Sequence, residues 1–177
     1  MEQSILRFVL PSGGIAMNKL VLSLPLVAAL ALPFAGPAFA VDDVNVSKGA
    51  TIAGPGLGVH GYDVVAYFTS GTPTLGNDKF AIAYNGATYR FANQANLDAF
   101  KANSAKYEPA FGGFCAYGAA LGKKFDGDPR LWKIVDGKLY LNLNSDIQAE
   151  WSKDVPGNIK KADSNWTKIR TIAPDKL

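Results

Sequence analysis

Two stretches of the sequence decide the fold: KFAIAYNGATYRF at residues 79–91 and LWKIVDGKLYLNLN at residues 131–144. Each contains apolar residues that alternate with small or polar ones, as in strands with one buried face. Asn85-Gly86 interrupts the first alternation, and Asp136-Gly137 interrupts the second. Asn-Gly and Asp-Gly provide the positive φ angles that a two-residue hairpin turn requires. The sequence therefore predicts two β-hairpins.

A helix is predicted directly after the first hairpin. Asn93 can cap it, because an asparagine side chain accepts a hydrogen bond from a first-turn backbone N–H. Leu97 and Phe100 then lie three residues apart on one face. The helix is expected to end before Pro109, because proline disfavours helix in the residue that precedes it.

Two more helices are predicted after the second hairpin. Ser145 and Gln148 have the spacing of a capping box, which typically begins a helix. Pro156-Gly157 is expected to end that helix and to form a corner. The last helix is amphipathic, and its apolar stripe consists of Ile159, Ala162, Trp166 and Ile169.

Hairpins separated by helices indicate a small single domain of the α+β class, with two β-hairpins packed against several short helices. We expect this domain over residues 59–170, with a tail at 171–177. The run VHGYDVVAYF at 59–68 fits either a buried strand or a short helix. Residues 41–58 contain several glycines and a proline and show no period, so they are expected to form a flexible lead-in.

The first 40 residues have the pattern of an export signal. From Met17 onward, Lys19 gives a short positive start, an apolar stretch follows, and Ala38-Phe39-Ala40 gives a small-x-small ending. The apolar stretch is interrupted by prolines and is shorter than the roughly 20 residues that a membrane span needs. We therefore predict a start at Met17 preceded by upstream residues, cleavage after Ala40, and a periplasmic or secreted protein without stable membrane insertion.

Composition excludes several classes of function. The chain has 177 residues, 48% of them hydrophobic, and a formal net charge of +3, which gives no electrostatic case for binding nucleic acid. One cysteine and one histidine exclude a disulfide within the chain and a zinc site of four Cys/His ligands. The segment FDGDP at 125–129 lacks the spaced oxygen ligands of a calcium loop, which indicates a turn.

Cys115 lies in the most distinctive segment, YEPAFGGFCAYGAALG at residues 107–122. Small residues follow it, which predicts a short helix that begins near Phe114. In a first helical turn, unpaired N–H groups and the helix dipole favour a thiolate, which is both a nucleophile and a metal ligand. The alternative is that Cys115 is a buried small hydrophobic residue.

Three functional hypotheses follow from the single thiol and the single imidazole. In the first, Cys115 and His60 converge and bind a transition metal, copper in preference to zinc, with help from Asp63 or a tyrosine. In the second, Cys115 is the nucleophile of a redox protein or thiol enzyme and His60 its base. In the third, the protein is a non-catalytic module that binds a small ligand or a protein. The first is our leading hypothesis, so the protein is expected not to be an enzyme.

Several blocks, taken in order, carry a family resemblance. They are HGYDVVAYF, the YNGATYRF hairpin, Y-x-P-x-x-G-G-x-C-A at 107–116, DPRLWKIVDGKLYLN, and an ending W-x-x-D-x-P-G-N-I-x-K-A-D-x-N-W. Together they span about residues 57–166. In these blocks the chain resembles the secreted bacterial YHS domain-containing proteins, some of which are described as selenoproteins.

The resemblance implies a YHS-like fold and places Cys115 at the position where those members are expected to carry selenocysteine. It also implies metal handling, which is associated with the wider class. Metal-binding members carry a cysteine pair after the first hairpin, whereas this sequence has Ala92 and Asn93 after Phe91. Any metal site carried over from the class would therefore depend on Cys115 and His60.

Overall fold

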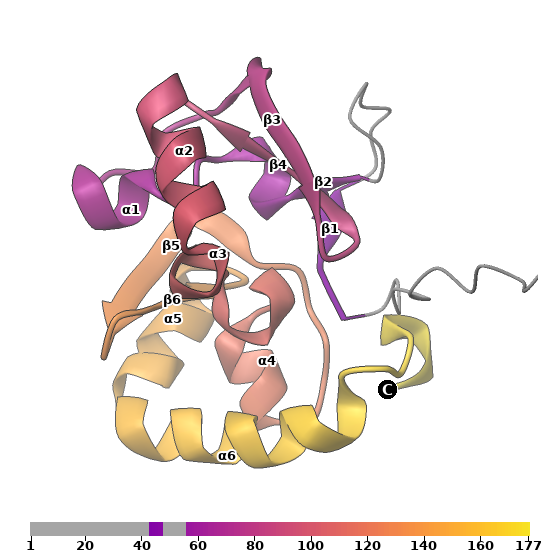
Figure 1. The fold of residues 1–177 in the computed structure, drawn as a ribbon. Helices are drawn as coiled ribbons and strands as arrows, with labels where there is room; N and C mark the ends of the chain where they lie inside the picture. Colours follow the sequence, from indigo (N-terminus) through magenta and orange to yellow (C-terminus); the bar gives the residue numbers. More distant parts are fainter. Residues whose placement is uncertain (1–42, 48–55) are drawn as a thin grey trace, which may run out of the picture. The chain divides into compact units, whose positions relative to one another are not determined.

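A computed structural model describes residues 43–47 and 56–177 of the chain. These residues are mixed α/β, as the sequence predicts, with two small sheets and several helices (Figure 1). Among them, no helix combines the length and the apolar character that crossing a membrane would require. The upstream residues, the expected signal at 17–40 and its cleavage site lie outside the described residues.

Both predicted hairpins are present. The first sheet has the strand order β1-β2-β4-β3, and the second consists of β5 and β6. β2 and β4 are parallel, whereas the pairs β1–β2, β3–β4 and β5–β6 are antiparallel. The strand bounds are β1 Val46–Ser47, β2 Leu57–Gly58, β3 Asn77–Tyr84, β4 Ala87–Phe91, β5 Asp128–Val135 and β6 Lys138–Asn142.

The hairpin turns have the backbone conformation that their residues predict. Asn85 and Gly86 have φ angles of 44° and 82°, and Asp136 and Gly137 have φ angles of 48° and 73°. Positive φ at both central residues gives a turn whose twist matches that of the flanking strands.

The helices are short except for the last (Figure 1). The 3₁₀ segments are labelled η. The bounds are η1 Val59–Gly61, α1 Ala66–Thr69, α2 Gln94–Ala102, α3 Ser104–Tyr107, η2 Ala110–Gly113, α4 Ala116–Ala120, α5 Ser145–Ser152, α6 Val155–Ile169 and η3 Pro174–Lys176.

The helix boundaries correct several expectations. Asn93 caps α2 as predicted, accepting from the Asn96 backbone N–H at 2.9 Å, but a separate turn, α3, follows before Pro109. The cap of α5 is Asn144 rather than Ser145, because the Asn144 side chain accepts from the N–H of Ile147.

Pro156 begins a helix instead of ending one. It lies in the first turn of α6, where its missing N–H costs no helical hydrogen bond. The side chain of Asp154 caps that turn by accepting from the Gly157 N–H at 3.0 Å. The corner between α5 and α6 therefore lies at residues 153–154, just before the proline.

Two other segments also differ from or refine the expectations. Part of the expected lead-in at 41–58 is strand, because β1 and β2 complete the first sheet. The run at 59–68 forms the 3₁₀ segment η1 and the short helix α1, which corresponds to the helical alternative.

Strand β6 lies between two hydrophobic cores. Leu139 and Leu141 belong to the core that contains the first hairpin and α2, whereas Tyr140 belongs to the core formed with α4, α5 and α6. Neighbouring side chains of a strand point to opposite faces. Because both faces of β6 are covered, this strand joins the two halves of the domain.

The segment around η2 brings the chain before β1 against the second half of the domain. Phe111, Gly112 and Gly113 have φ angles of 53°, 60° and 84°. The backbone N–H of Asn45 donates to the Gly112 carbonyl at 2.9 Å. A Cβ on Gly112 would lie 1.9 Å from the carbonyl oxygen of Asp43, so only glycine permits this approach.

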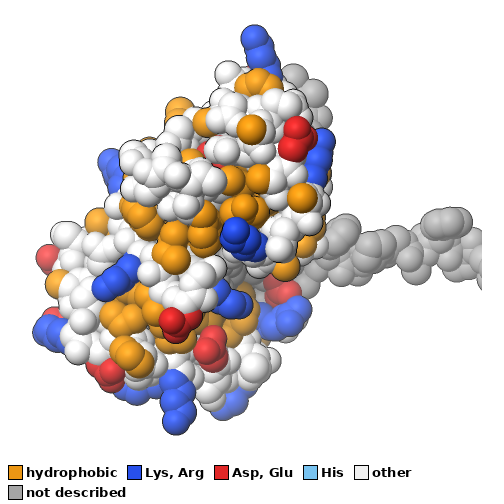
Figure 2. Space-filling view, turned by 60° about the vertical axis from the view of Figure 1, so that its left-hand side comes forward, with side chains coloured by type: hydrophobic (Ala, Val, Ile, Leu, Met, Phe, Trp, Pro, Cys, Tyr) orange, Lys and Arg blue, Asp and Glu red, His pale blue; other side chains and the backbone are white. Residues whose placement is uncertain are grey.

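The face of the molecule in Figure 2 carries lysine and arginine side chains interspersed with acidic ones. Hydrophobic side chains show between them, as they do on most soluble proteins. The most exposed large hydrophobic residues of the described part are Leu75, Leu121 and Phe125.

The Gly112 contact gives a test of the fold. We expect Gly112→Ala to lower the free energy of unfolding by about 3 kcal/mol, because the methyl group displaces Asp43 in addition to straining the backbone. In Gly137→Ala the new methyl group has open space around it, so only the strain of about 1 kcal/mol applies. Urea unfolding of both variants measures the difference, and equal losses would contradict the close approach.

Candidate functional site

Cys115 is buried and caps a helix. Its relative exposure is 0%, and its Sγ accepts from the backbone N–H of Gly118 at 3.4 Å, at the start of α4. The thiol lies 3.7 Å from Oδ1 of Asn142, to which it donates. Burial raises the pKa of the Cys115 thiol, and backbone N–H groups oppose that shift only in part. This corrects the expected thiolate: the helix start is present, but desolvation outweighs it.

His60 contacts a carboxylate that the sequence analysis had placed in a simple turn. Its Nε2 donates to Oδ1 of Asp126 at 2.8 Å, and Asn45 donates to the same oxygen at 2.6 Å. A cavity of about 250 Å³ beside His60 is also lined by Asp128 and Arg130. The Arg130 side chain holds the pKa of Asp128 below its usual range. Asp126 therefore orients the imidazole, the role that the sequence had suggested for Asp63.

Asp63 is fully buried and structural. Its Oδ1 accepts from the backbone N–H groups of Val65 and Ala66, at the start of α1. Its Oδ2 accepts from the Ala92 N–H at 2.8 Å and from Nδ2 of Asn96 at 2.6 Å. This carboxylate joins α1 to the end of the first hairpin and to α2.

The three residues predicted to bind a metal have separate surroundings. Cys115 does not line the cavity around His60, and the hydrogen bonds of Asp63 go elsewhere. Within residues 43–47 and 56–177, no group of three His, Cys, Asp or Glu side chains is placed to hold a metal ion. The predicted convergence of Cys115, His60 and Asp63 is therefore not found in the described residues.

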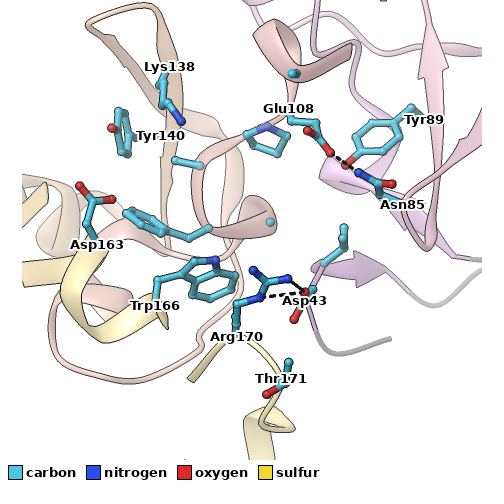
Figure 3. Close-up of a pocket in the computed structure, with 16 residues that line it drawn as sticks. Asp43, Asn85, Tyr89, Glu108, Lys138, Tyr140, Asp163, Trp166, Arg170 and Thr171 are labelled. Atoms are coloured by element: carbon cyan, nitrogen blue, oxygen red, sulfur yellow. Dashed lines mark hydrogen bonds and ion pairs between the residues drawn. The ribbon is translucent and has the colours of Figure 1, made fainter. Parts of the chain in front are cut away.

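A larger cleft, of about 710 Å³, lies elsewhere in the domain (Figure 3). Side chains from β6 and α6 form one wall, with Lys138, Tyr140, Asp163 and Trp166 labelled in the figure. The opposite wall comes from the first hairpin and from the segment between α3 and η2, with Asn85, Tyr89 and Glu108 labelled. The cleft thus draws its residues from both halves of the domain.

Arg170 lies at one end of the cleft and is held there by two sets of contacts. Its Nε and Nη2 donate to Oδ2 of Asp43 at 3.2 and 2.9 Å. The buried Lys124 ammonium donates to the carbonyls of Arg170 and Ile172 at 2.6 and 2.7 Å. A cation is favoured at a helix C-terminus, where backbone carbonyls lack helical partners. Lys124 therefore fixes the end of α6, and with it the position of Arg170.

Two tyrosine hydroxyls in the cleft lack protein partners. Tyr89 and Tyr140 have relative exposures of 1% and 5%, and both line the cleft. Neither hydroxyl makes a hydrogen bond to any other group in the described part of the chain. Burial, and then the charge of Glu108, raises the pKa of Tyr89; burial and Asp163 raise that of Tyr140. Both phenols therefore stay protonated at neutral pH.

Glu108 has a neutral partner. Its Oε1 accepts from Nδ2 of Asn85 at 2.8 Å, and the Tyr89 hydroxyl points toward this pair (Figure 3). On the opposite wall, Trp166 and Phe111 form an edge-to-face aromatic pair with centroids 5.7 Å apart. The cleft therefore combines aromatic surface with polar groups that have spare hydrogen-bonding capacity.

Sequence reasoning did not select the cleft residues as functional. Trp166 was expected in the apolar stripe of the last helix, and it does pack there while also facing the cleft. Lys138 and Glu108 lie in segments that the sequence analysis used for a hairpin turn and for Cys115, and Arg170 follows the last predicted helical stripe. These residues share only their place at the same cleft of the folded chain, and no pattern along the sequence indicates that place.

Comparisons with family models, curated proteins and solved structures found no match to this chain.

The burial of Cys115 leads to a test of its chemistry. We expect iodoacetamide to alkylate the native thiol at least about 100-fold more slowly than the urea-unfolded chain near neutral pH, because reaction requires opening of the structure. The folded pKa is raised, so the thiol's contribution to stability is complete below the unfolded pKa of about 8.5 and is lost as pH rises toward the folded value.

The control is the same chain in urea, since it has one cysteine and the label reports on one site. Rapid alkylation of the native chain, with a midpoint below the ordinary thiol pKa, would show that Cys115 is accessible and activated.

Proposed function

We propose that this protein is a non-catalytic module that binds a small organic ligand in the cleft between β6, α6 and the first hairpin. Among the hypotheses open from the sequence, this is the one that the geometry supports best. The observation that carries it is a cleft of about 710 Å³ lined by aromatic rings and by two tyrosines whose hydroxyls have no partner in the described part of the chain.

The size and lining of the cleft support this proposal. Small-molecule sites are typically concavities of about 300–1,000 Å³ with apolar walls and a few convergent polar groups. Trp166 and Phe111 provide the apolar surface, and the hydroxyls of Tyr89 and Tyr140 provide directional groups. A hydroxyl that makes no hydrogen bond within the protein is available to donate to, or accept from, a ligand in the cleft.

The position of Cys115 favours this function over the two chemical ones. A nucleophile needs access to its substrate and a base within hydrogen-bond reach. The thiol is fully buried, its pKa is raised, and its contacts are Asn142 and the Gly118 N–H rather than His60. The same burial removes the main support for copper binding through Cys115 and His60.

The proposal includes membership of the YHS class and a location outside the cytoplasm. The ordered blocks of resemblance support the first, and the three-part pattern at residues 17–40 supports the second.

Indole tests the proposed function, because it is a neutral aromatic probe without charge preferences. In a ¹H–¹⁵N NMR titration of the full chain, we expect shifts at the Trp166 side-chain N–H and at the amides of Ala110 and Gly112. The affinity is expected to be weak, with a Kd of about 1 mM, because indole is small.

A blocked variant provides the control. Ala105 is exposed and lines the cleft, so Ala105→Trp should fill its mouth and abolish the shifts without disturbing a core. Ala83→Trp, at an exposed position outside the cleft lining, should leave them intact. Binding in this cleft would be refuted if Ala105→Trp left the shifts unchanged, or if the shifted residues lay around His60 instead.

A further inference from the structure

We infer that the ligand of this cleft is a zwitterion that carries an ammonium and a carboxylate on an apolar body, as a free amino acid or a short peptide does. This inference rests on the proposed function and adds the ligand's chemical class. It follows from the placement of charges on the two walls.

Lys138 and Glu108 face the cleft from opposite walls (Figure 3). Within the described residues, the Lys138 ammonium forms no ion pair, and the only hydrogen bond to the Glu108 carboxylate comes from the neutral amide of Asn85. The two charges are also too far apart to pair with each other, since no ion pair joins them. Each wall therefore presents one charge that nothing in the described protein neutralises by contact.

Only a ligand with both charges satisfies both walls. An amine without a carboxylate is attracted by Glu108 but leaves Lys138 unpaired, and a carboxylate without an amine does the reverse. Asp163 adds a negative charge on the Lys138 wall; both side chains are exposed to solvent, which weakens the effect of each, whereas Glu108 is half-buried. Arg170 is already balanced by Asp43, so it adds little net charge.

The groups next to Glu108 suit an ammonium. An ammonium donates three hydrogen bonds, and two acceptors lie together here: the Glu108 carboxylate and the Tyr89 hydroxyl oxygen. Tyr89 is nine-tenths buried or more, so packing fixes its ring and gives its hydroxyl a fixed direction toward a ligand group.

The apolar body of the ligand has its own surface. In Figure 3, Trp166 lies between Asp163 and Arg170, and Phe111 packs edge-to-face against its ring. Aromatic rings of this kind pack against apolar or aromatic side chains, which favours amino acids with such side chains over glycine-like ones.

Three indole compounds separate the charges. L-Tryptophan carries both, tryptamine only the amine, and indole-3-propionate only the carboxylate. In NMR or calorimetric titrations of the full chain, we expect L-tryptophan to bind about two- to fivefold more tightly than either singly charged compound, as one extra exposed charge pair allows.

Two variants assign the charges to residues. Lys138→Gln should reduce the affinity for L-tryptophan to that for tryptamine, without weakening tryptamine. Glu108→Gln keeps an acceptor for the Asn85 amide. It should reduce the affinity for L-tryptophan to the affinity for indole-3-propionate. The matched controls, Lys79→Gln and Glu150→Gln, change the same residue types outside the cleft and should have no effect.

The outcomes distinguish the inference from the function on which it rests. The zwitterion inference is wrong if the three compounds bind the cleft with equal affinity, or if Lys138→Gln and Glu108→Gln leave the affinities unchanged. Either result leaves the proposed ligand-binding function standing. If none of the three compounds, nor indole, perturbs cleft residues, both the zwitterion and the proposed function are wrong.

Discussion

The structure depends on the burial of strand β6 on both faces. Leu139 and Leu141 pack into one core and Tyr140 into the other, so a five-residue strand holds two groups of elements together. Because side chains alternate along a strand, a shift of one residue would exchange the two faces and send the tyrosine into the core that now holds the two leucines. The Asp136-Gly137 turn fixes that register, and the register in turn places Lys138 and Tyr140 at the cleft.

The second constraint is the left-handed backbone around Gly112. It lets the chain before β1 pass close to η2, which brings Asp43 to Arg170 across 127 residues of sequence. Exposed ion pairs of this kind contribute little to stability on their own. The Asp43–Arg170 pair matters because of its position. It neutralises a guanidinium that would otherwise present an unbalanced positive charge to the cleft.

Local chemistry explains which parts of the fold could be predicted. The two hairpins follow from Asn85-Gly86 and Asp136-Gly137, and the start of α2 follows from Asn93, because each depends on a few adjacent residues. The predicted helix boundaries were wrong where the nearby residues fit two positions in a helix equally well. Asn144 and Ser145 are both good caps, and Pro156 fits the first turn of a helix as well as the position after its end.

The candidate site could not be predicted in the same way. Cys115, His60 and Asp63 attract notice because the first two residue types occur once each and all three are reactive, but rarity says nothing about distance. The desolvation of Cys115 depends on packing against Asn142 and Leu141, both remote in sequence. The cleft combines side chains from segments around residues 43, 85, 108, 138 and 170, which only the tertiary structure brings together.

The Lys124 ammonium has one further consequence, which concerns the C-terminal end of the chain. It is 5% exposed, lies against the faces of Phe114 and Trp166, and depends on the carbonyls of Arg170 and Ile172. A recombinant version that stopped at Ile169 would remove both of these carbonyls from the ammonium. Trimming the chain back to the end of α6 would therefore loosen the packing of Lys124 against Phe114 and Trp166.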